Sequence, residues 1–257
     1  MTDRKIIFDG ISNARDLGGL VNKDGKTIRR GFLIRSANLS QATQADVLRL
    51  KEEFHLRLVI DLRTPMAERM KRDVAIDGVD HRLIPIFDDA MIGITHESDR
   101  DYARRKTPMP RLSELYRLMV NEPVCREKFR TVLTDIMTNE SGASLWHCSE
   151  GKDRCGLTSA FLLTVLGVDR VQILEDYMLT NETALARGDL YYHKVLENGG
   201  SEEVAASVRD AFIVKEEYLR SALEAIEEKY PDVETFISQG LGVSEAVQNA
   251  FRKRMLM

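Results

Sequence analysis

The 257-residue chain contains little cysteine, and its cysteines are not arranged in pairs. Cys125, Cys148 and Cys155 are too few, and odd in number, for a disulfide framework. No C-x-x-C pair and no histidine and cysteine cluster has the spacing of a zinc site, so we expect no metal. We therefore expect all three cysteines to be free thiols in a reducing compartment.

The sequence also lacks a long apolar run and an excess of charge of one sign. It has no run of 18 apolar residues, and the start MTDRKIIFDG has too few apolar residues for a signal peptide. We therefore expect a cytoplasmic protein without an integral membrane segment, while export by a route that needs no signal stays open. With 37 basic and 41 acidic residues, the net charge of -4 gives no general attraction for nucleic acid, which we do not expect as a partner.

What is present indicates a folded α/β protein. A hydrophobic content of 43% argues against a disordered chain, and we expect one domain over residues 1–257. Short apolar runs predict strands at 32–36, 56–61 and 82–86, with helices between them that begin after Thr43 and after Thr64. This alternation predicts a central, mostly parallel sheet flanked by helices.

The second half of the chain is mainly helical. Apolar residues recur at helical spacing from Arg111 onward, and one strand is predicted at 143–147. The stretch 183–225 is charged and helix-forming, and we expect a helical insertion there, as a lid over the site or as a solvated helix pair. The strand at 143–147 leads through CSEGKDRCG into an apolar helix, an arrangement that points backbone N–H groups at an anion.

This loop places an arginine six positions after a cysteine. The nucleophile of a cysteine is its thiolate, and fixed N–H dipoles and cations at a helix N-terminus lower the pKa of a thiol. Cys148 is therefore the candidate nucleophile. The guanidinium of Arg154 can close the loop around a phosphate with two parallel hydrogen bonds, a geometry that a lysine cannot provide.

The residues between this cysteine and this arginine are candidates for binding the phosphate. Five intervening residues can form a loop whose amides converge on phosphate oxygens. Gly151 can adopt a positive φ in such a loop, and Lys152 adds a second cation. The predicted phosphate-binding or substrate-binding set is Ser149, Glu150, Gly151 and Lys152.

The motif HCSEGKDR at residues 147–154 resembles the H-C-x5-R signature of the protein tyrosine phosphatases. Its ending G-K-D-R is similar to that of a bacterial branch of tyrosine and dual-specificity phosphatases, some of which act on phosphoinositides. Further segments agree in order, namely NARDLGG at 13–19, LIRS at 33–36, VIDLR at 59–63 and EDY at 175–177. The resemblance covers residues 6–181 and implies the cysteine-dependent phosphatase fold.

Two positions depart from the family pattern. The family usually has serine or threonine after the arginine, where a hydroxyl stabilises the departing thiolate, but this chain has Cys155. A thiol is a weaker donor, so we expect slower turnover of the phosphocysteine. Cys155 is interpreted as a packed helix residue, with a resolving thiol that forms a disulfide with Cys148 as the alternative. Ala14 replaces a usual aromatic residue and affects only local packing.

The leaving oxygen needs a proton, for which a carboxyl group near the phosphate is the usual donor. The resemblance implies that Asp153 of the loop is this donor, with a role in stabilising the loop as the alternative. Asp88 and Asp89, which follow the predicted strand at 82–86, are the other candidate acids.

A further set of residues is expected to support the loop. His147 ends a buried strand, and we expect it to hydrogen-bond the loop rather than to take part in catalysis. The resemblance places four more residues at family positions, where we expect buried salt bridges that brace the loop. They are Arg15, Asp16, Asp61 and Arg63.

These observations predict a phosphatase that hydrolyses phosphotyrosine through a phosphocysteine, without metal or cofactor. Phosphoserine, phosphothreonine and phosphoinositides stay open as substrates, so the expected partner is a phosphorylated protein or a phospholipid headgroup. Two other functions are compatible with parts of the motif. One is an inactive phosphate-binding reader, and the other is a thiol redox or arsenate-reducing enzyme, against which the complete GKDR loop argues.

Overall fold

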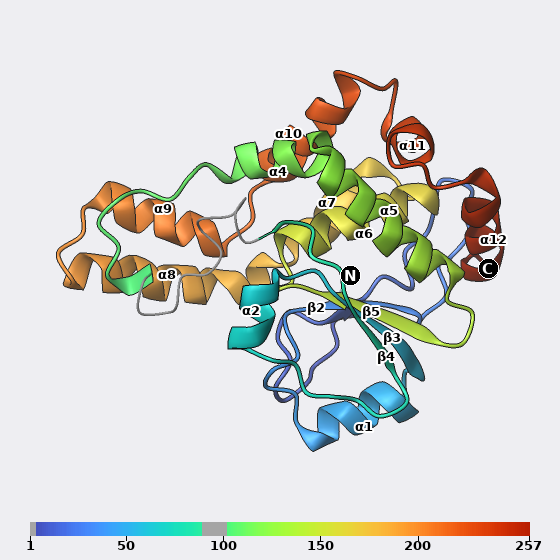
Figure 1. The fold of residues 1–257 in the computed structure, drawn as a ribbon, viewed down its shortest axis with the longest axis horizontal. Helices are drawn as coiled ribbons and strands as arrows, with labels where there is room; N and C mark the ends of the chain where they lie inside the picture. Colours follow the sequence, from blue (N-terminus) through green and yellow to red (C-terminus); the bar gives the residue numbers. More distant parts are fainter. Residues whose placement is uncertain (1–3, 89–101) are drawn as a thin grey trace.

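The computed structural model describes residues 4–88 and 102–257, and a five-stranded sheet lies at the centre of this part (Figure 1). The strand order is β1-β2-β5-β3-β4, in which β2, β5, β3 and β4 are parallel and β1 is antiparallel to β2. The strands are β1 (Arg15–Asp16), β2 (Leu33–Ser36), β3 (Leu56–Asp61), β4 (Asp80–Leu83) and β5 (Ala143–His147). The prediction of a mostly parallel α/β sheet is thus confirmed.

The strands predicted at 56–61 and 143–147 have the predicted bounds, and the first predicted strand begins one residue later, at Leu33. The prediction at 82–86 was wrong in its bounds, because β4 is Asp80–Leu83. β4 lies at the edge of the sheet, and its side chains are exposed. The apolar run that suggested a strand instead leaves the sheet and enters the core, where Ile86 is fully buried.

Helices cover both faces of the sheet. They are α1 (Gln44–Glu52), α2 (Pro65–Met70), α4 (Leu112–Asn121), α5 (Pro123–Thr138), α6 (Asp153–Val165), α7 (Arg170–Met178), α8 (Asn181–Glu197), α9 (Glu202–Phe212), α10 (Glu216–Glu227), α11 (Val233–Thr235) and α12 (Glu245–Met255), with a π-helical turn at Phe236–Gly240. The predicted start of α1 is confirmed, because Thr43 and Asp46 form a reciprocal capping box. Thr64 likewise caps α2 through the N–H of Ala67.

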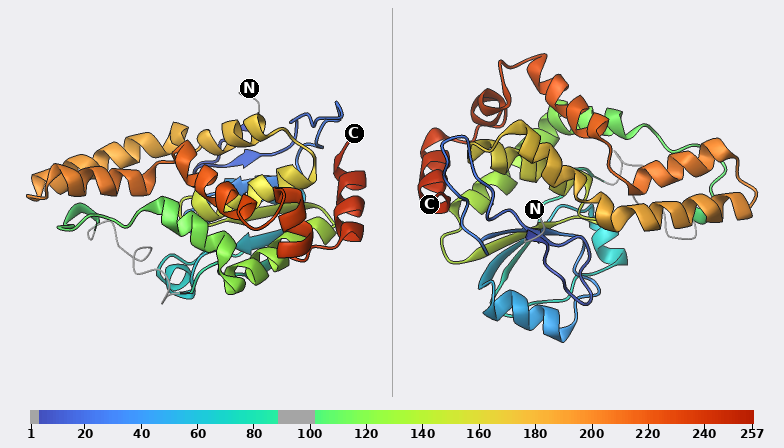
Figure 2. Two further views of the ribbon diagram at one scale, coloured as in Figure 1. Left: turned by 90° about the horizontal axis from the view of Figure 1, so that it is seen from above. Right: turned by 180° about the vertical axis from the view of Figure 1, so that it is seen from behind.

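The two faces of the sheet are buried by different layers because successive strand residues point to opposite sides. Ile34, Val59 and Leu145 lie in the core that includes α1. Ile60 and Trp146 lie in the larger core, which includes the buried faces of α4, α5, α6, α10 and α12. Figures 1 and 2 show α1 on one side of the sheet and the larger helical layer on the other.

The helical stretch expected as an insertion has two parts that pack differently. α8 and α9 pair as a hairpin that projects from the body of the molecule (orange in Figure 1) and has its own small core around Tyr191, Val208 and Phe212. α10 instead packs against α4 and contributes Leu219 to the main core. Among residues 4–88 and 102–257, no helix is both long and apolar enough to cross a membrane.

Candidate active site

The GKDR loop joins the C-terminal end of β5, in the middle of the sheet, to the N-terminus of α6. Cys148 directly follows the strand and is 1% exposed. Gly151 has φ of +66°, and a Cβ atom at this position would lie 2.4 Å from the carbonyl oxygen of Ser36. The tight approach of the loop to β2 therefore requires glycine at residue 151.

The loop turns its carbonyl groups outward. The side-chain amide of Asn13 donates to the carbonyls of Glu150 and Gly151, at 2.8 and 3.1 Å. Asn38 holds the carbonyl of Ser149 with its side chain at 2.8 Å. In the described part of the chain, none of the backbone N–H groups of residues 149–154 is donated to a backbone carbonyl. These N–H groups, at the N-terminus of α6, form a cradle for an anion.

A buried arginine braces the same loop from behind. Arg35 of β2 donates to the carbonyls of Gly151 and Lys152, at 2.8 and 3.3 Å, and forms an ion pair with Asp176. Arg4 and Arg15 contact the same carboxylate, so three guanidinium groups share Asp176. Burial, followed by the charge of Arg35, lowers the pKa of Arg15 to about 10. Arg15 was expected to form a buried salt bridge. In the structure its carboxylate partner is Asp176, which belongs to the EDY segment.

The surroundings of Cys148 favour its thiolate. The neighbouring thiol of Cys155 is the largest cause that lowers the pKa of Cys148 well below its ordinary value, and the charge of Arg154 and the N–H of Lys152 act in the same direction. They outweigh the desolvation of the buried thiol, which acts in the opposite direction. The pKa of Cys155 is raised well above its ordinary value, by burial and then by Cys148, so Cys155 remains a neutral thiol. Its Sγ also lies 3.8 and 3.9 Å from the carbonyl oxygens of Ser36 and Trp146, which accept from it.

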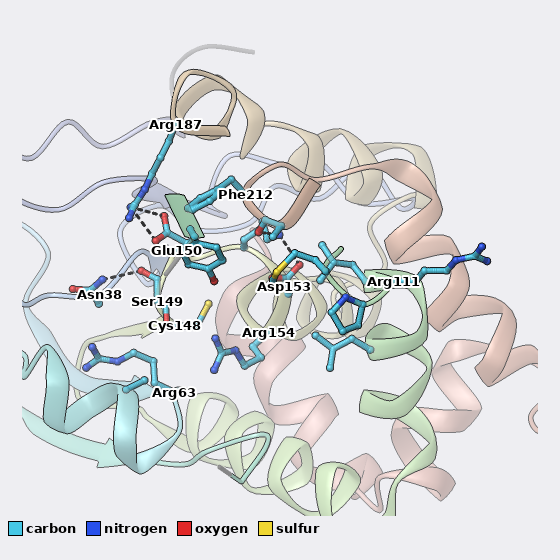
Figure 3. A pocket seen from close by; sticks show the side chains of 18 of the residues that line it. Asn38, Arg63, Arg111, Cys148, Ser149, Glu150, Asp153, Arg154, Arg187 and Phe212 are labelled. Carbon is cyan, nitrogen blue, oxygen red and sulfur yellow. Dashed lines mark hydrogen bonds and ion pairs between the residues drawn. The ribbon is translucent and has the colours of Figure 1, made fainter. Parts of the chain in front are cut away.

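A cavity of about 400 Å³ opens above the loop (Figure 3). Figure 3 shows the thiol of Cys148 with the guanidinium group of Arg154 nearby and Arg63 farther along the cavity wall. One nitrogen of Arg154 donates to the carbonyl of Leu62 at 3.3 Å, which anchors the guanidinium beside the loop. The rim and wall of the cavity are largely apolar or aromatic, and include Tyr102, Met109, Leu112, Leu115 and Phe212.

Asp153 also lines this cavity, and its side chain is 18% exposed. Its Oδ1 accepts a hydrogen bond from the hydroxyl of Tyr116 at 2.9 Å and lies 3.3 Å from the Nζ of Lys152. The structure therefore places this carboxyl group in the same cavity as Cys148. Asp88 does not line the cavity, is exposed and lies near Cys125, while Asp89 lies outside the described residues.

Two loop side chains extend to the α8–α9 hairpin. The ammonium group of Lys152 is buried and donates to the carbonyls of Ala211 and Ile213, at 2.8 and 3.2 Å. Glu150 accepts two hydrogen bonds of 3.0 Å from Arg187 of α8. Burial raises the pKa of Glu150, although the charge of Arg187 opposes this shift.

His147, the residue before Cys148, belongs to a buried charge network with Asp61, Asp73 and Arg63. Its Nε2 lies 3.0 Å from Oδ2 of Asp73, and its Nδ1 lies 3.8 Å from Oδ1 of Asp61. Arg63 bridges the two carboxylates, at 2.7 Å from Asp61 and 2.9 Å from Asp73. Asp61, Asp73 and His147 are close enough to hold a metal ion. Because Arg63 already balances these carboxylates, the donor set fits an ion-pair network better than a metal centre.

The remaining supporting residue, Asp16, stabilises the backbone near the site. Its carboxylate accepts from the N–H groups of Gly18 and Gly31, at 2.8 and 2.7 Å. The sequence alone did not indicate a role for several residues that hold the loop. Three of them, Asn13, Arg35 and Asp176, lie inside the segments that resemble the phosphatase family. Asn38, Asp73, Tyr116 and Arg187 lie outside these segments and gave no signal, because each contacts the site from a distant part of the chain.

Known proteins are similar to this sequence over most of its length. The model of the tyrosine phosphatase family matches residues 6–257. A Cupriavidus necator protein, named as a candidate tyrosine-protein phosphatase, is 30% identical over 94% of this chain and 85% of its own. The triple specificity protein phosphatase PtpB of Mycobacterium tuberculosis is 26% identical over 96% of this chain and 97% of its own. The chain therefore belongs to the tyrosine phosphatase family and is a phosphatase.

Proposed function

We propose that this chain hydrolyses phosphotyrosine on proteins, with Cys148 as the nucleophile and Arg154 as the phosphate clamp. The observation that carries the proposal is the Cys148 thiol, whose pKa is well below its ordinary value, beside a cradle of backbone N–H groups. A phosphate held by these N–H groups and by Arg154 would present its phosphorus to the thiolate. The family match and the names of the relatives support the same chemistry.

The proposed reaction has two steps. The thiolate of Cys148 forms a bond to phosphorus while the bond from phosphorus to the tyrosine oxygen breaks, and Asp153 gives its proton to that oxygen. Asp153 then takes a proton from water, which attacks the phosphocysteine and releases inorganic phosphate and the Cys148 thiolate. The N–H groups of residues 149–154 and the guanidinium of Arg154 stabilise the equatorial oxygens in both steps.

The shape and lining of the cavity favour an aryl phosphate. A volume of about 400 Å³ accommodates a phenyl ring above the loop, and aromatic side chains from Tyr102 and Phe212 are placed to contact it. The name of the Mycobacterium tuberculosis relative indicates that three substrate classes are accessible to a protein of this kind. Phosphoserine, phosphothreonine and phosphoinositides are therefore proposed as secondary substrates.

We also propose that residues 1–257 form one phosphatase domain and that the α8–α9 hairpin is an insertion that covers the site. Glu150 and Lys152 link the loop to the hairpin, and Phe212 at the end of α9 lines the cavity. A cytoplasmic location is part of the proposal. It is supported by the three free cysteines, Cys125, Cys148 and Cys155, which suit a reducing compartment.

A side-by-side turnover assay tests the proposed function. Phosphotyrosine, phosphoserine and phosphothreonine peptides and a phosphoinositide are compared at equal concentration with wild type, Cys148→Ser and Arg154→Lys. We expect the phosphotyrosine peptide to be hydrolysed fastest, Cys148→Ser to bind it without turnover, and Arg154→Lys to lose most activity because the bidentate fork is gone. Binding without turnover by the wild type would instead identify a phosphate-binding reader, and retained activity in Cys148→Ser would exclude the mechanism.

A further inference from the structure

Two buried tyrosines form a chain of hydroxyl groups that ends on Asp153. Tyr116 of α4 is fully buried, and its hydroxyl donates to Oδ1 of Asp153 at 2.9 Å. The hydroxyl of Tyr177 of α7, a residue that is 1% exposed, lies 2.7 Å from the hydroxyl of Tyr116. The rings of the two tyrosines pack edge to face, with centroids 6.3 Å apart. Asp153, at the start of α6, is thus connected to two other helices.

The direction of the hydrogen bonds follows from the number of protons. Each phenol has one proton to donate, and an ionised carboxylate can only accept. When Asp153 is ionised, Tyr116 must donate to it, so the oxygen of Tyr116 is free to accept from Tyr177. Burial raises the pKa of both tyrosines well above the ordinary value, and the charge of Asp153 adds to this effect, so both phenols keep their protons.

The two oxygens of the Asp153 carboxyl group have different surroundings. Oδ1 accepts from Tyr116 and also lies 3.3 Å from the ammonium group of Lys152. Oδ2 has no hydrogen-bond or ion-pair partner within residues 4–88 and 102–257. Because both donors are on Oδ1, a proton on this carboxyl group is most easily accommodated on Oδ2. Oδ1 is therefore the anchored oxygen, and Oδ2 is the oxygen that is free to carry a proton.

We infer that Tyr116 and Tyr177 are positioning residues for the proton donor: their hydroxyl chain fixes Oδ1 of Asp153 so that Oδ2 transfers the proton to the leaving oxygen. The inference rests on the proposed function, in which Asp153 is the donor. Neither tyrosine lines the cavity above the loop. Both act by keeping the carboxyl group at one orientation, which matters because small displacements of a catalytic group lower the rate strongly.

A leaving-group series tests the inference. Phenyl phosphate has a poor leaving group that needs its proton, whereas a polyfluorinated aryl phosphate needs little protonation. Since general acid catalysis contributes typically 10²- to 10⁴-fold, we expect Tyr116→Phe to slow phenyl phosphate by about tenfold and the activated ester by less than about twofold. Tyr177→Phe should show the same pattern with a smaller loss, because Tyr116 keeps its bond to Asp153.

Tyr218→Phe is the matched control. Tyr218 packs on the ring of Tyr116, with centroids 6.1 Å apart, and its hydroxyl has no hydrogen bond to a described residue. Loss of this hydroxyl should leave the rates for both esters unchanged. Thermal melting of each variant shows whether it is folded, and Tyr177→Phe carries the test if Tyr116→Phe does not fold.

The double variant Tyr116→Phe with Asp153→Asn separates failure of this inference from failure of the proposed function. If Tyr116 acts only through Asp153, its substitution should add no further loss to Asp153→Asn. The inference is overturned if Asp153→Asn slows phenyl phosphate selectively but Tyr116→Phe and Tyr177→Phe slow both esters equally or not at all. If Asp153→Asn itself shows no selectivity, Asp153 is not the donor, and the role of Asp153 in the proposed function fails together with this inference.

Discussion

The Nε2 atom of His147 lies 3.0 Å from a carboxylate oxygen of Asp73, and the histidine, directly before Cys148, is fully buried. Burial lowers the pKa of His147, but the contact with Asp73 and the charges of Asp61 and Asp73 outweigh burial and raise this pKa. The pKa of Asp73 is lowered, because contact with His147 and Arg63 outweighs its burial. A charged His147 and an ionised Asp73 therefore stabilise one another next to the nucleophile.

This pair predicts a specific dependence of stability on pH. A raised histidine pKa contributes stability that is complete below the unfolded value of about 6.5 and is lost as the pH rises through the folded value. The contribution of Asp73 is already complete above its unfolded value of about 3.9 and stays constant in this range. We therefore expect the melting temperature to fall above about pH 6.5 in the wild type, and to fall less in Asp73→Asn.

Asp80→Asn is the control for this measurement, because Asp80 is an exposed carboxylate beside Arg82. Its melting curve should depend on pH as the wild type does. If the melting temperature depends on pH equally in the wild type and in Asp73→Asn, Asp73 does not stabilise the protonated form of His147.

A second prediction concerns the thiol of Cys155 as a donor to the nucleophile. Cys155→Ala removes the neighbouring thiol that contributes most to the low pKa of Cys148, so this pKa should rise. Cys155→Ser keeps a donor, and a better one, so its pKa should stay low and its turnover should equal or exceed that of the wild type. The pH profile of iodoacetamide alkylation at Cys148 reports this pKa. An unchanged midpoint in Cys155→Ala would exclude this role for Cys155.

A third prediction concerns the hairpin. Arg187→Ala breaks the two hydrogen bonds to Glu150 and should loosen the cover that we propose. We expect KM for a phosphotyrosine peptide to fall by up to about fivefold, because a partly exposed ion pair contributes up to about 1 kcal/mol. The KM for a small aryl phosphate should change less.

Arg209→Ala is the matched control on the same hairpin, since Arg209 pairs with Asp189 at the surface, away from the cavity lining. Its KM values should match those of the wild type for both substrates. A fall in KM of the same size for peptide and small ester in Arg187→Ala would show that the hairpin does not limit access.

Much of the site could be predicted from the sequence because it lies in one short segment. Cys148, Gly151 and Arg154 are within one loop, so their spacing alone indicates a phosphate cradle. The strands at 56–61 and 143–147 were predictable because they are buried, apolar and bounded by turn residues. β4 was misplaced because an exposed edge strand has no apolar pattern.

The contacts that hold the loop could not be predicted in the same way. Asp73, Tyr116 and Asp176 lie far from the loop in sequence, and only the fold brings them to His147, Asp153 and Arg35. The direction of a side chain is also invisible in a motif. Lys152 lines the cavity, but the motif could not show that its ammonium group also donates to the carbonyls of Ala211, at the end of α9, and Ile213.

The most direct test of the account is to trap the phosphocysteine. Asp153→Asn, which lacks the base for the second step, is mixed with an activated aryl phosphate, quenched in acid and digested, and the phosphorylated peptide is identified by mass spectrometry. Cys148→Ser, and Cys125→Ala as a second cysteine variant, are treated in the same way. The pKa of Cys125 is raised to about 11 by burial, and it lies outside the cavity lining. We predict phosphate on Cys148, its loss in Cys148→Ser and its retention in Cys125→Ala; release of phenol without any phosphorylated Cys148 peptide would contradict the mechanism.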